Sequence, residues 1–128
     1  MIELIDGLPE GVIGIEAVGR VTLEDYDNVV APVVERALAS HEKIRLLHVI
    51  GDRFTEHAAS ALFEDAKLGL SNLRSIERIA VVTDIAHFRA LVKGAGWTVP
   101  GDLKLFSNAE RADAEAWVSE GLEDDSSD

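Results

Sequence analysis

Residues 44–51 read IRLLHVIG, an apolar run rich in branched side chains that is bounded by Lys43 and by the Gly51-Asp52 pair. A run this short and this β-branched is typical of a buried strand rather than of a helix. Residues 76–83, IERIAVVT, have the same character and predict a second buried strand. The other elements are placed relative to these two segments.

Three more strands are expected toward the two ends of the chain. Residues 2–6, IELID, and residues 11–18, GVIGIEAV, alternate with the two-residue period of a strand, and the intervening GLPEG is short enough for a hairpin turn. We therefore expect these two strands to be antiparallel neighbours. Residues 102–106, DLKLF, predict a last, short strand in which Lys104 would protect an exposed edge.

Helical periodicity marks four further segments, which begin at about residues 22, 55, 84 and 107. Each is expected to start at a capping side chain, namely Thr22, Thr55, Asp84 and Ser107, the last within a capping box. Pro32 lies inside the first of these helices, where it removes a backbone donor and crowds the preceding turn. A kink or local break is expected near residues 28–32.

The predicted order of elements is therefore ββαβαβαβα, which indicates an α/β fold. We expect a single five-stranded, mostly parallel sheet with one antiparallel edge strand and four main helices, connected by right-handed crossovers. Residues 1–119 are expected to form this one domain. Residues 120–128 hold five acidic residues and no basic residue, so we expect an acidic, disordered tail there.

The charge balance restricts the classes of partner. The 128 residues include 24 acidic and 12 basic side chains, a formal net charge of −12. This charge repels nucleic-acid phosphates and anionic membrane surfaces, so we expect neither nucleic-acid binding nor membrane insertion. No apolar run approaches the roughly 18 residues of a membrane span, and the acidic start MIELIDGLPEG lacks the positive charge of a secretory signal. A cytoplasmic location is expected.

Several kinds of reaction centre are missing from the sequence. There is no cysteine, which excludes disulfides, thiolate metal sites and cysteine nucleophiles. Neither a glycine-rich phosphate loop nor the Gly-x-Ser-x-Gly turn of hydrolases is present. Asp52 and His57 lack an evident third ligand, so no metal is expected, and His48 is interpreted as a partly buried structural imidazole. We expect no enzymatic activity and no cofactor.

The element order, with its N-terminal hairpin, resembles the SpoIIAA-like family, whose relatives are STAS domains and CRAL-TRIO lipid-transfer proteins. The resemblance covers nearly the whole chain except the tail, and it rests on fold-level patterns rather than on a catalytic signature. The segments that carry it are GRVTLEDYDNVVAPVVERAL (19–38), KIRLLHVIGDRF (43–54), ALFEDAKLGL (61–70), IERIAVVTD (76–84) and NAERADAEAWV (108–118). It implies a non-enzymatic binding or regulatory module that acts through protein-protein contacts in a bacterial-type cytoplasm.

In STAS regulators related to this family, a strand ends in Asp-x-Ser and the serine is the phosphorylated switch. The equivalent region here reads Gly51-Asp52-Arg53-Phe54-Thr55. Asp52 is present, but Phe54 stands in the place of the serine, and Thr55 is the nearest hydroxyl. We interpret Thr55 as a helix cap, with phosphorylation as the alternative role.

Open parallel sheets place their ligands beyond the carboxyl ends of the strands. Arg20, Asp52 and Arg53 are expected at this edge, with Phe54 and Thr55 next to them. The two arginines, together with free backbone donors of helix starts, would suit a small anion. Turns and helix caps require the same residue types, so a purely structural role is the alternative.

A second kind of ligand is suggested by Trp97, which lies in the loop GAGWTVPG at residues 94–101. Trp97 either folds back onto the edge of the core or closes over a cavity lined by Tyr26, Val30 and Phe54 beside Pro32. In the second case the chain would be a carrier or sensor of a small hydrophobic, lipid-like molecule, as CRAL-TRIO relatives are. This is the alternative function.

The expected interface with a protein partner is a weak apolar strip on the helix predicted at residues 55–71. Ala58, Ala61 and Leu68 form this strip, and the Trp97 loop is the other candidate surface. The partner is either a different protein or a second copy of this chain in a homodimer.

Overall fold

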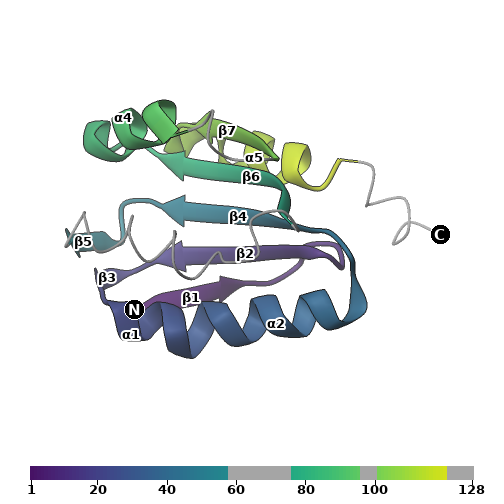
Figure 1. The fold of residues 1–128 in the computed structure, drawn as a ribbon. Helices are drawn as coiled ribbons and strands as arrows, with labels where there is room; N and C mark the ends of the chain where they lie inside the picture. Colours follow the sequence, from purple (N-terminus) through teal and green to yellow (C-terminus); the bar gives the residue numbers. More distant parts are fainter. Residues whose placement is uncertain (58–75, 96–100, 121–128) are drawn as a thin grey trace.

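The computed structural model describes residues 1–57, 76–95 and 101–120. Five strands form one mixed sheet: β1 (Ile2–Ile5), β2 (Val12–Ala17), β4 (Ile44–Ile50), β6 (Ile76–Thr83) and β7 (Asp102–Phe106). Their spatial order is β1-β2-β4-β6-β7 (Figure 1). β1 is antiparallel to β2, and the other neighbouring pairs are parallel. The α/β class and the five-stranded sheet with one antiparallel edge strand are thus confirmed.

Two strands that the local pattern does not predict form a separate parallel pair, β3 (Gly19–Val21) with β5 (Phe54–His57). The prediction of a helix starting at Thr55 is therefore wrong, because Thr55 lies within the strand β5 with an exposed side chain. The cause is a contact between distant segments, because the N–H of Gly19 donates to the carbonyl oxygen of Arg53 at 2.7 Å. Residues 58–71 of the expected helix lie outside the described residues.

The first helical region begins at α1 (Leu23–Asp25), continues through the π-helical turn η1 (Tyr26–Val30) and ends as α2 (Ala31–Ser40). Thr22 caps it as expected, since its Oγ1 accepts a hydrogen bond from the N–H of Asp25 at 3.4 Å. The irregularity expected near Pro32 is present as the π-helical turn, which ends just before the proline enters α2. Pro32 therefore stands in the first turn of α2, where its missing N–H is tolerated.

The other described helices are α4 (Ala86–Ala95) and α5 (Arg111–Val118), the latter preceded by the 3₁₀ turn η4 (Asn108–Glu110). The described chain thus has three helical regions where four were expected. Asp84 is not at the predicted cap position, because α4 begins only at Ala86, and Asp84 Oδ1 accepts the N–H of Asn108 at 2.9 Å. None of the described helices has the length and apolar character that crossing a membrane requires.

The two faces of the sheet carry separate apolar clusters. One face packs against α2 and α4, and the opposite face packs against α5 through Ala114 and Val118, both fully buried. On the α5 face the hairpin loop between β1 and β2 approaches closely, since a Cβ added at Gly14 would lie 2.6 Å from Leu8 Cδ1. The α5 face is therefore covered by the hairpin loop at one side and by α5 at the other.

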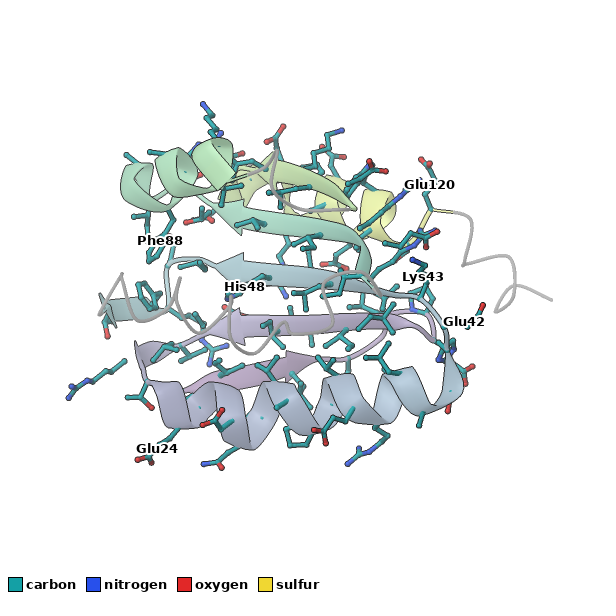
Figure 2. All side chains as sticks on the ribbon, viewed as in Figure 1. Glu24, Glu42, Lys43, His48, Phe88 and Glu120 are labelled. Carbon is teal, nitrogen blue, oxygen red and sulfur yellow. The ribbon has the colours of Figure 1, made fainter. Side chains whose placement is uncertain are left out.

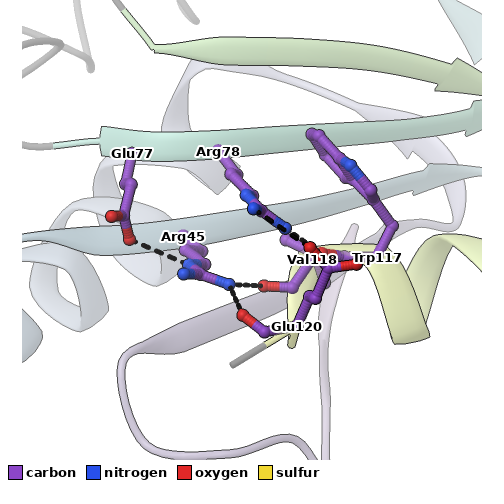
Figure 3. Close-up of polar contacts among 6 residues, drawn as sticks. All are labelled: Arg45, Glu77, Arg78, Trp117, Val118 and Glu120. Atoms are coloured by element: carbon purple, nitrogen blue, oxygen red, sulfur yellow. Dashed lines mark hydrogen bonds and ion pairs between the residues drawn. The ribbon is translucent and has the colours of Figure 1, made fainter. Parts of the chain in front are cut away.

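The C-terminal end of α5 is fixed by two arginines from the sheet (Figure 3). Arg45 on β4 donates through Nη1 to the carbonyl oxygen of Val118 at 3.1 Å and through Nε to Glu77 at 2.9 Å. Arg78 on β6 donates to the carbonyl oxygen of Trp117 at 2.8 Å, and its guanidinium lies 5.2 Å from the centre of the indole ring. These bonds satisfy carbonyls that a helix end leaves free, and they hold α5 in place over the sheet.

Candidate functional site

A pocket of about 250 Å³ opens on the α5 face, at the carboxyl ends of β2, β4 and β6. Its walls come from three strands, from the turn after β4, and from the start of the last helical region. The lining residues are Glu16, Val49, Gly51, Asp52, Arg53, Val82, Asn108 and Arg111. The pocket thus combines charges of both signs with an apolar base.

Glu16 is the buried charge of this pocket. It belongs to β2 and is only 8% exposed. Its Oε1 lies 3.8 Å from Arg53 Nη1 and 3.5 Å from Arg111 Nη1. Both distances exceed the roughly 2.7–2.9 Å of a charge-assisted hydrogen bond. The carboxylate is therefore flanked by two cations at distances that leave space for a further donor.

Arg53 is held in position chiefly by Glu3 on the edge strand. Its Nη1 and Nη2 donate to the two carboxylate oxygens of Glu3 at 3.0 and 3.1 Å, a two-pronged pairing. Glu3 and Glu16 are directly opposite each other in the β1–β2 register. Like charges in that position destabilise a sheet, so Arg53 offsets a repulsion that the strand pairing itself creates.

Asp52 and Asn108 close the outer side of the pocket. Asn108 Nδ2 donates to Asp52 Oδ1 at 3.4 Å, and the N–H of Asn108 donates to Asp84 Oδ1 at 2.9 Å. Asn108 Oδ1 is buried and has no hydrogen-bond donor among the residues that the structure describes. An added Cβ at Gly51 would lie 3.9 Å from that oxygen, so the glycine leaves room beside it.

The start of the last helical region is set by Ser107 and Glu110, which confirms the predicted capping residues. Glu110 Oε1 accepts the N–H of Ser107 at 2.9 Å. Hydrogen bonding to Ser107 holds the pKa of Glu110 below its usual value, so its carboxylate stays charged. This arrangement fixes the turn that carries Asn108 and the helix start that carries Arg111.

The structure brings some of the predicted ligand residues together and separates others. Asp52 and Arg53 both line the pocket. Arg20 on β3 and Thr55 on β5 are exposed on the adjacent strand pair and do not line it. Phe54 is 9% exposed and packs edge-to-face on Phe88, with ring centres 5.8 Å apart.

The residues predicted for the lid and the interface lie largely outside the described parts. Trp97, Ala58, Ala61 and Leu68 fall in undescribed segments, and Tyr26 is placed only by its backbone in η1. The lid and the apolar strip therefore stay predictions.

Glu16 and Arg111 were not predicted as site residues. Glu16 is the single charged residue in GVIGIEAV, and a charge within an otherwise apolar strand was the available signal. Arg111 follows the predicted capping box and shows no comparable signal, because its role depends on the packing of α5 against β2.

His48 lies at the middle of the sheet, on β4 (Figure 2). Its register partners are Ile15 on β2 and Val81 on β6, both in the apolar cluster of the α2 face. Burial lowers the pKa of His48 to about 4, so the imidazole is neutral near pH 7. The described residues contain no group of three His, Asp or Glu side chains that is arranged to hold a metal.

Comparison with known proteins identifies the family. The SpoIIAA-like family model matches residues 12–119. The chain belongs to the SpoIIAA-like family. No curated protein gives a significant match. The chain is also similar to a solved structure with a SpoIIAA-like fold, that of an uncharacterised protein of the DUF3478 family from Shewanella loihica PV-4. The two sequences are 28% identical, the TM-score is 0.69, and the match covers 92% of each chain. The expected family and the SpoIIAA-like fold are confirmed.

Proposed function

We propose that this SpoIIAA-like domain is a non-enzymatic binding or regulatory module that acts through protein-protein contacts at the carboxyl edge of its sheet. The observation that carries the proposal is the state of Arg53. Its side chain is 54% exposed, yet its guanidinium is held by both oxygens of Glu3. A long side chain that is fixed before an encounter loses less conformational entropy when a partner binds.

Arg53 belongs to a patch that we call the carboxyl-edge surface, formed by the exposed residues Arg20, Asp52, Arg53 and Thr55. These residues come from the paired strands β3 and β5 and from the turn before β5. The hydrogen bond from the N–H of Gly19 to the carbonyl oxygen of Arg53 joins the two segments. The patch is therefore presented on paired backbone rather than on an isolated loop.

The polar groups of the adjacent pocket suit the binding of a charged or hydrogen-bonding group. Its described polar lining consists of the two carboxylates of Glu16 and Asp52, the two guanidiniums of Arg53 and Arg111, and the amide of Asn108. A guanidinium does not release its proton near neutral pH, and an amide side chain does not titrate. Each carboxylate lies beside a guanidinium or an amide, so the pocket is suited to hold a charged or hydrogen-bonding group.

A position-specific cross-linking experiment tests the proposal. A photoreactive amino acid is placed at Asp52 in the full chain and, as a matched control, at the exposed Glu24 on α1 (Figure 2). After irradiation in the source cells, we expect a discrete heteromeric adduct from position 52 and none from position 24. The adduct yield should fall when Arg53→Gln is added, because the guanidinium that Glu3 holds in place is then missing. Equal adducts from the two positions, or none from position 52, would refute a partner contact at this surface.

The regulatory version of the proposal is supported by the exposure of Thr55. A negative charge on Thr55 would change the local field beside Arg20 and Arg53. The variant Thr55→Glu should therefore change the yield of the position-52 adduct several-fold relative to Thr55→Val. Equal yields from the two variants would leave the chain as a constitutive binding module.

The alternative, a carrier of a small apolar ligand, is less well supported. Val30 and Phe54, two of the residues expected to line its cavity, are both packed in the apolar cluster of the α2 face. Extraction of the purified protein with organic solvent tests the carrier function directly. A stoichiometric lipid-like molecule in the extract would favour the carrier over the protein-binding module.

A further inference from the structure

The geometry points to a basic side chain, the ammonium of a lysine or the guanidinium of an arginine on a partner protein, as the group that enters the pocket beside Glu16. This inference rests on the proposed function and names the chemistry of the partner at that site. The hydrogen-bond acceptors of the pocket indicate which type of partner side chain would bind there.

Three residues with acceptor groups, from three separate elements, line this pocket. Glu16 comes from β2, Asp52 from the turn after β4, and Asn108 from η4. The buried Asn108 Oδ1 has no donor among the described residues, and the closest arginine nitrogen to Glu16 is 3.5 Å away. A buried acceptor without a donor destabilises the folded state, so a donor-rich group would bind favourably here.

The distribution of charge favours a cation over an anion. Arg53 is already paired with Glu3, and Arg111 Nε lies 3.3 Å from a carboxylate oxygen of Glu115. Because both arginines are already paired with other carboxylates, the negative charges of Glu16 and Asp52 exceed the positive charge that is left to balance them. An anion would have to compete with these carboxylates for the same two guanidiniums, whereas a cation would not.

The size of the pocket and the number of acceptors fit one side chain. A volume of about 250 Å³ is below the range of roughly 300–1,000 Å³ typical of small-molecule sites. A lysine ammonium carries three N–H donors and an arginine guanidinium carries five, which matches acceptors on three sides. The exposed Asp52 stands at the outer rim, where a side chain projecting from a partner surface would enter.

The test is an NMR titration of the full-length, ¹⁵N-labelled chain with single-residue analogues. N-acetyl-lysine methylamide and N-acetyl-arginine methylamide should cause saturable shifts of the Asn108 side-chain amide. N-acetyl-norleucine methylamide, which has a similar stem without the charge, should cause none. 1,4-Diaminobutane tests the other source of the same chemistry, a free amine. Tighter binding of the diamine than of either analogue would overturn the assignment to a protein side chain.

Matched variants locate the binding. Glu16→Gln removes the buried charge with little change in shape and should weaken binding of the lysine analogue at least tenfold. Glu24→Gln makes the same change in net charge at an exposed residue of α1 that does not line the pocket, and it should leave binding unchanged. Gly51→Ala keeps every charge but places a methyl group in contact with Asn108 Oδ1, and it should also weaken binding. Equal affinity in wild type, Glu16→Gln and Gly51→Ala would overturn the inference.

The two proposals fail in different ways. If the position-52 adduct forms but neither analogue shifts the Asn108 amide, the protein contact stands and the basic side chain is wrong. If the analogues bind in the pocket but no adduct forms, the cation site stands and the partner-binding function is wrong.

Discussion

Arg111 Nη1, at the first residue of α5, lies 3.5 Å from Glu16 Oε1 on β2. This pair connects the helix on one face of the sheet to the strand beside the edge strand. Arg53 approaches the same carboxylate oxygen from the turn after β4, at 3.8 Å. Two cations from different elements therefore share one buried carboxylate, and the effects of removing them should depend on each other.

Replacement of both arginines by glutamine tests this sharing. Because each arginine is partly exposed, Arg53→Gln or Arg111→Gln alone should lower the free energy of unfolding only slightly. The double variant should lose more than the sum of the single variants by about 1 kcal/mol, since Glu16 is then buried without a cation. Urea unfolding of the four proteins measures the difference. Simple additivity would show that Glu16 is solvated independently of both arginines.

Removal of Arg45 should loosen the anchor of α5. Arg45→Met leaves the carbonyl oxygen of Val118 without its donor, and a loss of about 1–3 kcal/mol in the free energy of unfolding is expected. Arg36→Met on the exposed side of α2 is the matched control, with an expected change within about 0.5 kcal/mol. Equal effects of the two substitutions in urea unfolding would contradict an anchoring role for Arg45.

The protein should lose stability as the pH falls from 6.5 toward 4 because of His48. Burial depresses the pKa of this group from 6.5 to about 4 in the folded state, so the unfolded state binds the proton first. The stabilising contribution is fully present above pH 6.5 and is lost as pH falls to about 4. A shift of this size corresponds to at most roughly 3 kcal/mol, and residual access of solvent reduces it.

The variant His48→Leu isolates this contribution from the carboxylates that titrate in the same range. Its free energy of unfolding should change less than that of the wild type between pH 7 and pH 5. Parallel pH profiles for the two proteins would exclude His48 as the cause.

Two glycines should respond to alanine in opposite directions. A Cβ at Gly101 would lie 2.4 Å from the carbonyl oxygen of Ile76 and 2.7 Å from that of Glu77, so the backbone must move. Gly101→Ala should cost about 1–3 kcal/mol of unfolding free energy. Gly94→Ala, on α4 with open space around the new Cβ, should stabilise by about 0.5–1 kcal/mol. A thermal unfolding series compares them, and a neutral Gly101→Ala would show that β7 can move away from β6.

Elements with strong local patterns were predicted well from the sequence. Residues 76–83 form β6 with the predicted bounds, and residues 44–50 form β4, because buried strands in a parallel sheet are continuous apolar runs. The hairpin turn and the capping residues Ser107 and Glu110 were also recognisable, since each depends on residues a few positions apart.

Features that depend on distant contacts were not predicted. β3 has three residues and exists through its pairing with β5, so the local sequence FTEH looked like the start of a helix. Asp52 and Arg53 were predicted at the site because strand ends are visible in the sequence. Their relation to Glu16 and Arg111 requires the packing of α5 on the sheet, which periodicity does not specify.

The bond from Gly19 to the carbonyl oxygen of Arg53 has a kinetic consequence. The backbone of Arg53 is bonded to β3 and its side chain is bonded to Glu3 on β1, so its guanidinium charge is fixed at both ends of the residue. A partner surface whose charge is complementary to this region would be attracted at long range, and no loop would have to rearrange before binding. Added salt should therefore slow association with the proposed partner steeply and alter the lifetime of that complex much less.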